Sequence, residues 1–251
     1  MASKYRMLRR ETRKIQTPGG VTVTLVRVQR ISDGAVGGWI EHARNLSQDG
    51  TCWVAGRAAV YGHAHVCAAA QVYGNAQVCG GAQVCGGAQV CGSARVYGSA
   101  HVSGSAHVYG SAQIYGSARV SGSARVSGEA QVYGDAQIYG DAQIYGSAHV
   151  YGSAQIYGSA RVSGSARVYG GAAVGAGVRL THCVQMSGGT IAGNIWLCGD
   201  LRIAASIGGL RIWPAPSDMD VDAPSAAISA EQSSPPKFGS VARTPRRARR
   251  T

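Results

Sequence analysis

Histidine and carboxylate side chains are the first candidates for chemistry in this chain. Between residues 54 and 173 they are His63, His65, His101, His107, His149, Glu129, Asp135 and Asp141. A His held against a carboxylate could act as a general base, and three convergent His could hold a catalytic zinc ion. Which of these sites can form depends on the elements that position the side chains.

Those elements are dictated by a short internal repeat. From Val54 to Val174 a Val or Ile stands at every sixth position, and Ala follows four residues after each one. Gly stands two residues after the aliphatic residue in every unit except one, where Ala68 replaces it. Twenty consecutive hexads therefore cover residues 54–173, and a period this short determines the architecture.

Each hexad contains a short strand and a corner. In Ala-Arg-Val-Tyr the Ala and Val point to one side and the Arg and Tyr to the other, and the small and β-branched pair suits a narrow core. Gly-Ser or Gly-Asp then supplies turn chemistry. Three hexads form one 18-residue coil, so the sequence predicts an all-β, three-sided solenoid of parallel strands.

An 18-residue coil aligns outward side chains in columns. The first is Tyr61, Cys79, Tyr97, Tyr115, Tyr133, Tyr151 and Tyr169. The second is Cys67, Cys85, Ser103, Ser121, Tyr139 and Tyr157, and the third is Tyr73, Cys91, Tyr109, Ser127, Tyr145 and Ser163. Aromatic rings about 4.8 Å apart can stack as a ladder. The Tyr residues of the first column either fit the pleated surface or form an association face.

The coil also separates the candidate catalytic groups. His65 and His101 share a face but lie two coils apart, about 10 Å, while His107 and His149 lie on the other two faces. The spacing predicts surface His and no metal site, and it leaves any catalytic residue unidentified. Cys67 and Cys85 are stacked one coil apart, but two thiols cannot complete a zinc site. The seven Cys indicate no disulfide framework, and outward small fillers are expected at these positions.

The segments outside the repeat predict caps and a tail. Residues 1–53 are expected to form an N-terminal β cap, with a hairpin around Thr17-Pro18-Gly19-Gly20 and with Trp39 and Trp53 either closing the coil or binding a ligand. Residues 54–191 are the predicted β-helix and residues 192–213 a C-terminal cap. Residues 214–251 are rich in Pro, Ala and Ser, which predicts a disordered basic tail.

The [Val/Ile]-x-Gly-x-Ala-x pattern resembles the hexapeptide-repeat left-handed β-helix. The lead-in from Gly37-Gly38-Trp39-Ile40-Glu41 to Cys52-Trp53-Val54 is similar to that of YdcK-like proteins. These proteins are found in bacteria and their phages and are often labelled acetyltransferase-like. The resemblance covers about residues 4–190. It implies a left-handed coil and, as a possible activity, acyl transfer at a site between subunits of a trimer. The family's usual hexad differs, because its small residue directly follows the aliphatic one.

The net charge of +12 resides at the two ends of the chain. Residues 1–30 carry eight Lys and Arg against one Glu, and residues 237–251 carry six Lys and Arg and no acid. The terminal run Arg243, Arg246, Arg247, Arg249 and Arg250 could contact a polyanion, although a solvated tail is the simpler reading. No run of about 20 apolar residues is present, so we expect no membrane segment and a cytoplasmic location.

The sequence favours a non-catalytic structural or interaction protein without a cofactor. Protein partners or self-association, with a homotrimer as one form, would use Tyr61, Tyr97, Tyr115, Tyr133, Tyr151 and Tyr169. One alternative is an acyltransferase-like enzyme that takes acyl-coenzyme A between subunits. Another is a nucleic-acid-associated scaffold that binds through its basic termini.

Overall fold

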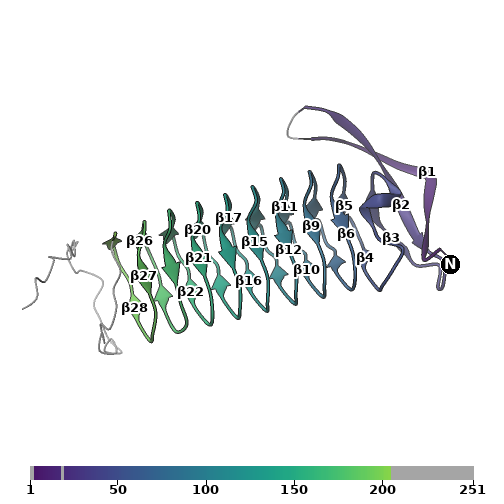
Figure 1. Ribbon diagram of the computed structural model, residues 1–251. Coiled ribbons are helices and arrows are strands. Elements are labelled where there is room, and N and C mark those ends of the chain that lie inside the picture. The colour runs from purple at the N-terminus through teal and green to yellow at the C-terminus, as the bar shows by residue number, and fades with distance from the viewer. Residues whose placement is uncertain (1–2, 18–19, 205–251) are drawn as a thin grey trace, which may run out of the picture.

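A computed structural model describes residues 3–17 and 20–204. The chain is a parallel β-solenoid with three sheets, as the hexads predict, and a β-hairpin lies at the N-terminal end of the coil (Figure 1). No helix long and apolar enough to cross a bilayer occurs in the described part of the chain.

The twelve-stranded sheet joins the N-terminal strands to one face of the coil. Strand β1 (Tyr5–Gln16) pairs antiparallel with β2 (Thr22–Arg30), and β2 pairs antiparallel with β3 (Val36–Ile40). Strand β3 then runs parallel to β5, with Ile40 opposite Val60. The face continues through β5 (Ala59–Val60), β8 (Gln77–Val78), β11 (Arg95–Val96), β14 (Gln113–Ile114), β17 (Gln131–Val132), β20 (His149–Val150), β23 (Arg167–Val168), β26 (Gln185–Met186) and β29 (Arg202–Ile203).

The other two faces of the coil are parallel sheets of two-residue strands. The nine-stranded sheet contains β4 (Trp53–Val54), β7 (Gln71–Val72), β10 (Gln89–Val90), β13 (His107–Val108), β16 (Arg125–Val126), β19 (Gln143–Ile144), β22 (Arg161–Val162), β25 (Arg179–Leu180) and β28 (Trp196–Leu197). The eight-stranded sheet contains β6 (His65–Val66), β9 (Gln83–Val84), β12 (His101–Val102), β15 (Arg119–Val120), β18 (Gln137–Ile138), β21 (Gln155–Ile156), β24 (Ala173–Val174) and β27 (Thr190–Ile191).

The core follows directly from the hexad. The Val, Ile and Ala residues that define the repeat are fully buried along the coil axis. Backbone groups pair from one coil to the next, as in the bond from the Tyr115 N–H to the Val132 carbonyl at 3.0 Å. The pairing uses polar backbone groups that would otherwise be buried without partners. Each coil is therefore held by its neighbours rather than by a globular core.

The glycine of each corner is required by its backbone conformation. At Gly116 φ is 71°, and an added Cβ would lie 2.8 Å from the backbone nitrogen of Gly134 in the next coil. L-residues rarely adopt this left-handed region. Ala68 is the exception within the hexads, with φ of 58°.

The N-terminal end of the coil is closed by polar and apolar side chains. A single 3-10 turn, η1 (Ala43–Asn45), places the buried Asn45 over the first coil, where its side-chain nitrogen donates to the carbonyls of Gly62 and Ala64. The buried Tyr5 hydroxyl hydrogen-bonds to the carbonyls of Ala43 and Leu46 at 2.8 Å each. Trp53 is also buried, beneath the Arg30 guanidinium.

The coil continues past the twentieth hexad. Strands β27, β28 and β29 pair with residues 17 positions earlier instead of 18, as Thr190 does with Ala173. The reason is that Ile191 follows Met186 by five residues, where the hexads have six. Strands β28 and β29 lie in the segment 192–213, whose residues from 205 onward fall outside the described part. The predicted basic tail 214–251, with Arg243, Arg246, Arg247, Arg249 and Arg250, also lies outside it.

Candidate interaction face and hairpin groove

Five tyrosines of the first column form a continuous stack, which we call the tyrosine ladder (Tyr97, Tyr115, Tyr133, Tyr151 and Tyr169). Successive ring centroids are 4.9, 4.8, 4.9 and 5.0 Å apart, and the ring planes differ by 1–5°. Each tyrosine directly follows a strand of the twelve-stranded sheet, so the sheet spacing sets the ring spacing. The predicted ladder is confirmed.

Hydrogen bonds and burial act on the hydroxyls of three tyrosines in the ladder. The hydroxyls of Tyr97 and Tyr115 donate to Gln113 and Gln131, respectively, both at 3.4 Å. Burial is the main cause that raises the pKa values of Tyr97, Tyr115 and Tyr133 above the usual value of 10.0. These three phenols are therefore neutral at physiological pH.

The ladder is the longest aromatic stack in the described residues. In the second column Tyr139 and Tyr157 stack at 5.5 Å. In the third column Tyr109 stands between Cys91 and Ser127 and Tyr145 between Ser127 and Ser163, and both are about 40% exposed. The first column therefore differs from the other two in continuity.

Tyr61 belongs to the same column but is covered by the hairpin. It is 4% exposed and lies in a buried cluster with Leu25 and Ala59, against which Val23 and Cys79 pack. Burial, followed by a hydrogen bond with Cys79, raises the Tyr61 pKa well above its ordinary value. Of the six tyrosines predicted to form an association face, five lie in the open ladder and Tyr61 lies under the hairpin.

A groove lies where the hairpin meets the start of the ladder. Its volume is about 370 Å³, within the range of small-molecule sites. Its described lining consists of Thr17 and Val23 from the hairpin, Glu41, and the column residues Tyr61, Cys79 and Tyr97 with the corners Gly62, Gly80 and Gly98. The rings of Tyr61 and Tyr97 and the backbone of three glycine corners therefore form much of the lining of the groove.

The His residues stay separated, as the spacing predicts. His65 and His101 are both paired with Gln83 on opposite sides, so they lie two coils apart. His149 lies beside Arg167, and burial, then that guanidinium, lower its pKa. No group of three His, Cys, Asp or Glu residues that could hold a metal ion occurs in the described ranges.

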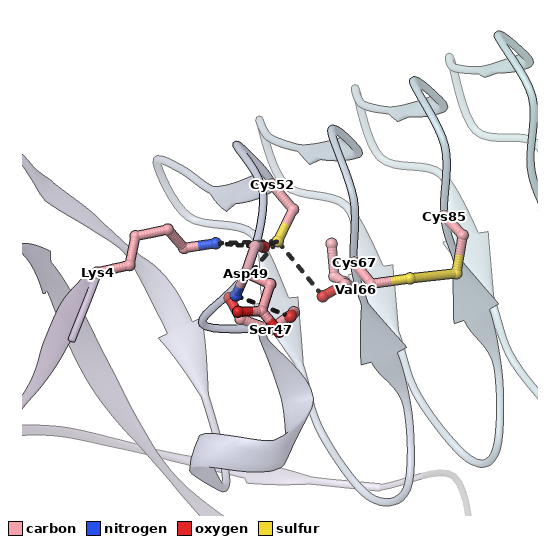
Figure 2. The surroundings of a disulfide bond; sticks show 7 residues. All are labelled: Lys4, Ser47, Asp49, Cys52, Val66, Cys67 and Cys85. Carbon is pink, nitrogen blue, oxygen red and sulfur yellow. Dashed lines mark hydrogen bonds between the residues drawn. A yellow bond between two sulfur atoms is a disulfide. The ribbon is translucent and has the colours of Figure 1, made fainter. Parts of the chain in front are cut away.

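The cysteines differ from expectation at one position. Cys67 and Cys85 form a disulfide across successive coils, with Cα atoms 4.9 Å apart (Figure 2). The expectation of unlinked fillers was wrong here, because equivalent positions one coil apart fall within the 4.4–6.8 Å range that a disulfide spans. The signal in the sequence was this pair's separation of 18 residues.

Cys52 is a buried free thiol at the cap. The Lys4 ammonium lies 3.1 Å from its sulfur and also contacts the Asp49 carbonyl (Figure 2). The thiol in turn reaches the carbonyls of Ser47 and Val66. These contacts tie the segment before β1 to the first coil, so Cys52 and Lys4 have a positioning role in the cap.

Comparison with known families agrees with this architecture. The family model described as YdcK Beta solenoid repeat matches residues 70–86, 88–104, 112–128, 136–152 and 154–172. No curated protein matches the chain significantly. The matched segments fall inside the coil, on strands β7 to β23. The chain is therefore a β-solenoid whose coil carries YdcK-type repeats between residues 70 and 172.

Proposed function

We propose that this protein is a non-catalytic interaction scaffold that associates with a second copy of itself through the tyrosine ladder. The observation that carries the proposal is the unbroken stack of five rings on one face of a rigid coil. The five rings are half-buried and contiguous. Contiguous apolar surface is typical of interaction sites, and tyrosine combines a large contact area with little conformational freedom to lose.

A second copy is the partner whose geometry matches the ladder. It presents rings at the same spacing of 4.8–5.0 Å, so two ladders can keep one register along their whole length. Identical side chains pack this way between paired sheets in cross-β structures. A closed symmetric assembly would also use the same patch on each copy.

The separation of the His residues supports a scaffold over an enzyme. Acyl transfer needs a base held within hydrogen-bond reach of the proton it removes, and none of the strand His residues faces a carboxylate in the described hydrogen bonds and ion pairs. A site formed between subunits is the alternative. Calorimetry with acetyl-coenzyme A tests it: tight, stoichiometric binding would favour the enzyme.

The self-association proposal is tested with a ladder variant and a matched control. In Tyr115→Ser/Tyr133→Ser two ladder rings are replaced by Ser, which the coil already carries at Ser103 and Ser121. The control, Tyr109→Ser/Tyr145→Ser, removes two rings of the third column, which do not stack.

Sedimentation velocity measures the result. The wild-type chain of 25.8 kDa is expected to sediment as a dimer or trimer at micromolar concentration. The ladder variant should associate at least tenfold more weakly, and the control should be unchanged. A monomeric wild type, or an equal effect of both variants, would refute the proposal.

A further inference from the structure

The hairpin groove has a feature that neither the repeat nor the ladder requires. Cys79 takes the place of a tyrosine between Tyr61 and Tyr97, so a small thiol stands where the column elsewhere carries a ring. Burial is the largest cause that raises the Cys79 pKa above 9.0, so the thiol is protonated and uncharged at neutral pH. We call the space beside Cys79, between the coils of Tyr61 and Tyr97, the gap; on the Tyr61 side it is closed, because Tyr61 is 4% exposed and hydrogen-bonds with Cys79.

The dimensions of this gap suit a planar ring. The strands of Tyr61 and Tyr97 are two coils apart, about 9.6 Å at a spacing of about 4.8 Å per coil. A ring above Cys79 would be about one ladder spacing from the Tyr97 ring, the separation at which Tyr115 and Tyr133 stack, whereas the buried Tyr61 offers no free face. Offset stacking at this centroid distance is favourable for aromatic groups.

The two sides of the gap are open to different degrees. Gly62, Gly80 and Gly98 form the adjoining corner and contribute no side chains, while Val23 and Thr17 of the hairpin stand opposite. Because Val23 packs against the cluster of Leu25 and Tyr61, the hairpin side is held in place. The gap is therefore a pre-formed groove rather than a flat surface.

Glu41 supplies charge at one end of the groove. Its carboxylate accepts a hydrogen bond of 2.7 Å from the Gly62 N–H, and its side chain is 19% exposed. Its other described partner is His42, whose Nε2 lies 3.6 Å away. Glu41 is the charged residue among the described lining residues. The exposed Arg95 is outside the lining, but its positive charge acts on Tyr61, Cys79 and Tyr97. A carboxylate in this position favours a cationic group on the ligand.

We propose that the groove binds a small arylalkylamine: a single planar aromatic ring above Cys79 with its ammonium group directed to Glu41. Gly62 and Gly80 are equivalent corners of neighbouring coils, so Glu41, which bonds to the Gly62 N–H, lies at the corner one coil from Cys79. The proposal does not depend on self-association, since Tyr115 and Tyr133 lie outside the groove.

Three probes of one shape and different charge test this directly. The full chain is titrated by calorimetry with tyramine, p-cresol and 3-(4-hydroxyphenyl)propionate. Tyramine should bind at one site per chain with a dissociation constant of about 0.1–5 mM, which is what about ten non-hydrogen atoms support. We expect p-cresol to bind at least threefold more weakly and the propionate more weakly still.

Two variants and a control locate the site. Cys79→Tyr completes the column and should abolish tyramine binding, whereas Cys91→Tyr fills the equivalent gap between Tyr73 and Tyr109 on the nine-stranded face and should leave binding unchanged. Glu41→Gln keeps an acceptor for the Gly62 N–H and should remove the preference for tyramine over p-cresol without loss of p-cresol binding.

Thermal melting of each variant checks that the hairpin remains folded. If Cys79→Tyr displaces the hairpin, Glu41→Gln still tests the proposal. The proposal is overturned by the absence of saturable tyramine binding. Equal affinity for the three probes, or unchanged binding by a folded Cys79→Tyr, overturns it as well.

Discussion

Replacement of one corner glycine by alanine should destabilise the coil by a predictable amount. Gly86 has φ of 67°, and an added Cβ would lie 2.8 Å from the carbonyl oxygen and 2.9 Å from the nitrogen of Gly104. The left-handed conformation costs an L-residue about 1–2 kcal/mol, and displacement of the next coil adds about 1–3 kcal/mol. Gly86→Ala should therefore lower the free energy of unfolding by about 2–5 kcal/mol.

Gly87 provides an adjacent control for this substitution. A Cβ at Gly87 would be 3.7 Å from the Gly104 carbonyl oxygen, which is ordinary contact, and its φ is outside the left-handed region. Gly87→Ala should change the free energy of unfolding by no more than about 0.5 kcal/mol. The pair thus separates the corner requirement from the general effect of an added methyl group.

Thermal unfolding followed by circular dichroism measures the difference. Gly86→Ala is expected to lower the midpoint by about 5–15 °C, while Gly87→Ala leaves it within about 2 °C. Ala68 holds the same corner one coil earlier, so Gly86→Ala should still fold. Equal midpoints for the two variants would refute the argument that the corner conformation selects glycine.

Two further predictions concern the disulfide and the ladder. Cys67→Ser/Cys85→Ser should lower the free energy of unfolding by about 2–4 kcal/mol in denaturant titrations. Dithiothreitol should lower the stability of the wild type but not that of the variant. A wild type whose stability is unchanged by dithiothreitol would show that the bond contributes nothing. Because the pKa values of Tyr97, Tyr115 and Tyr133 are raised on folding, their stabilisation is complete below the unfolded pKa of about 10 and is lost as pH rises through the folded values. Unfolding measured from pH 9 upward, within the ~9–12 range around that pKa, should show a steeper loss for the wild type than for Tyr115→Ser/Tyr133→Ser; parallel curves would contradict the ladder's role.

The coil could be predicted because every hexad has the same residue types at the same positions. Val or Ile at every sixth position gives the core, Gly the corner, and a spacing of 18 residues the columns, so Tyr115 and Tyr133 could be placed together without coordinates. The step between Met186 and Ile191 was not predicted, because a coil shortened by one residue leaves no periodic signal.

The groove could not be predicted because it depends on a long-range contact. Val23 and Leu25 alternate as in any amphipathic strand, and nothing in their order says that they cover Tyr61 rather than another face. The position of Cys79 within the first column was evident from the repeat, but its meaning depends on where the hairpin lies. The disulfide was not predicted because Cys67 and Cys85, although expected to stack, were considered only as ligands of a metal site.

The most direct test of the central claim is the nitration of individual tyrosines by tetranitromethane at increasing protein concentration, with the modified residues identified by mass spectrometry. If the ladder is the face through which copies associate, nitration of Tyr115 and Tyr133 should slow as the protein is concentrated, while Tyr109 and Tyr145 react at a constant rate. Ladder tyrosines that react at the same rate at every concentration would contradict the claim.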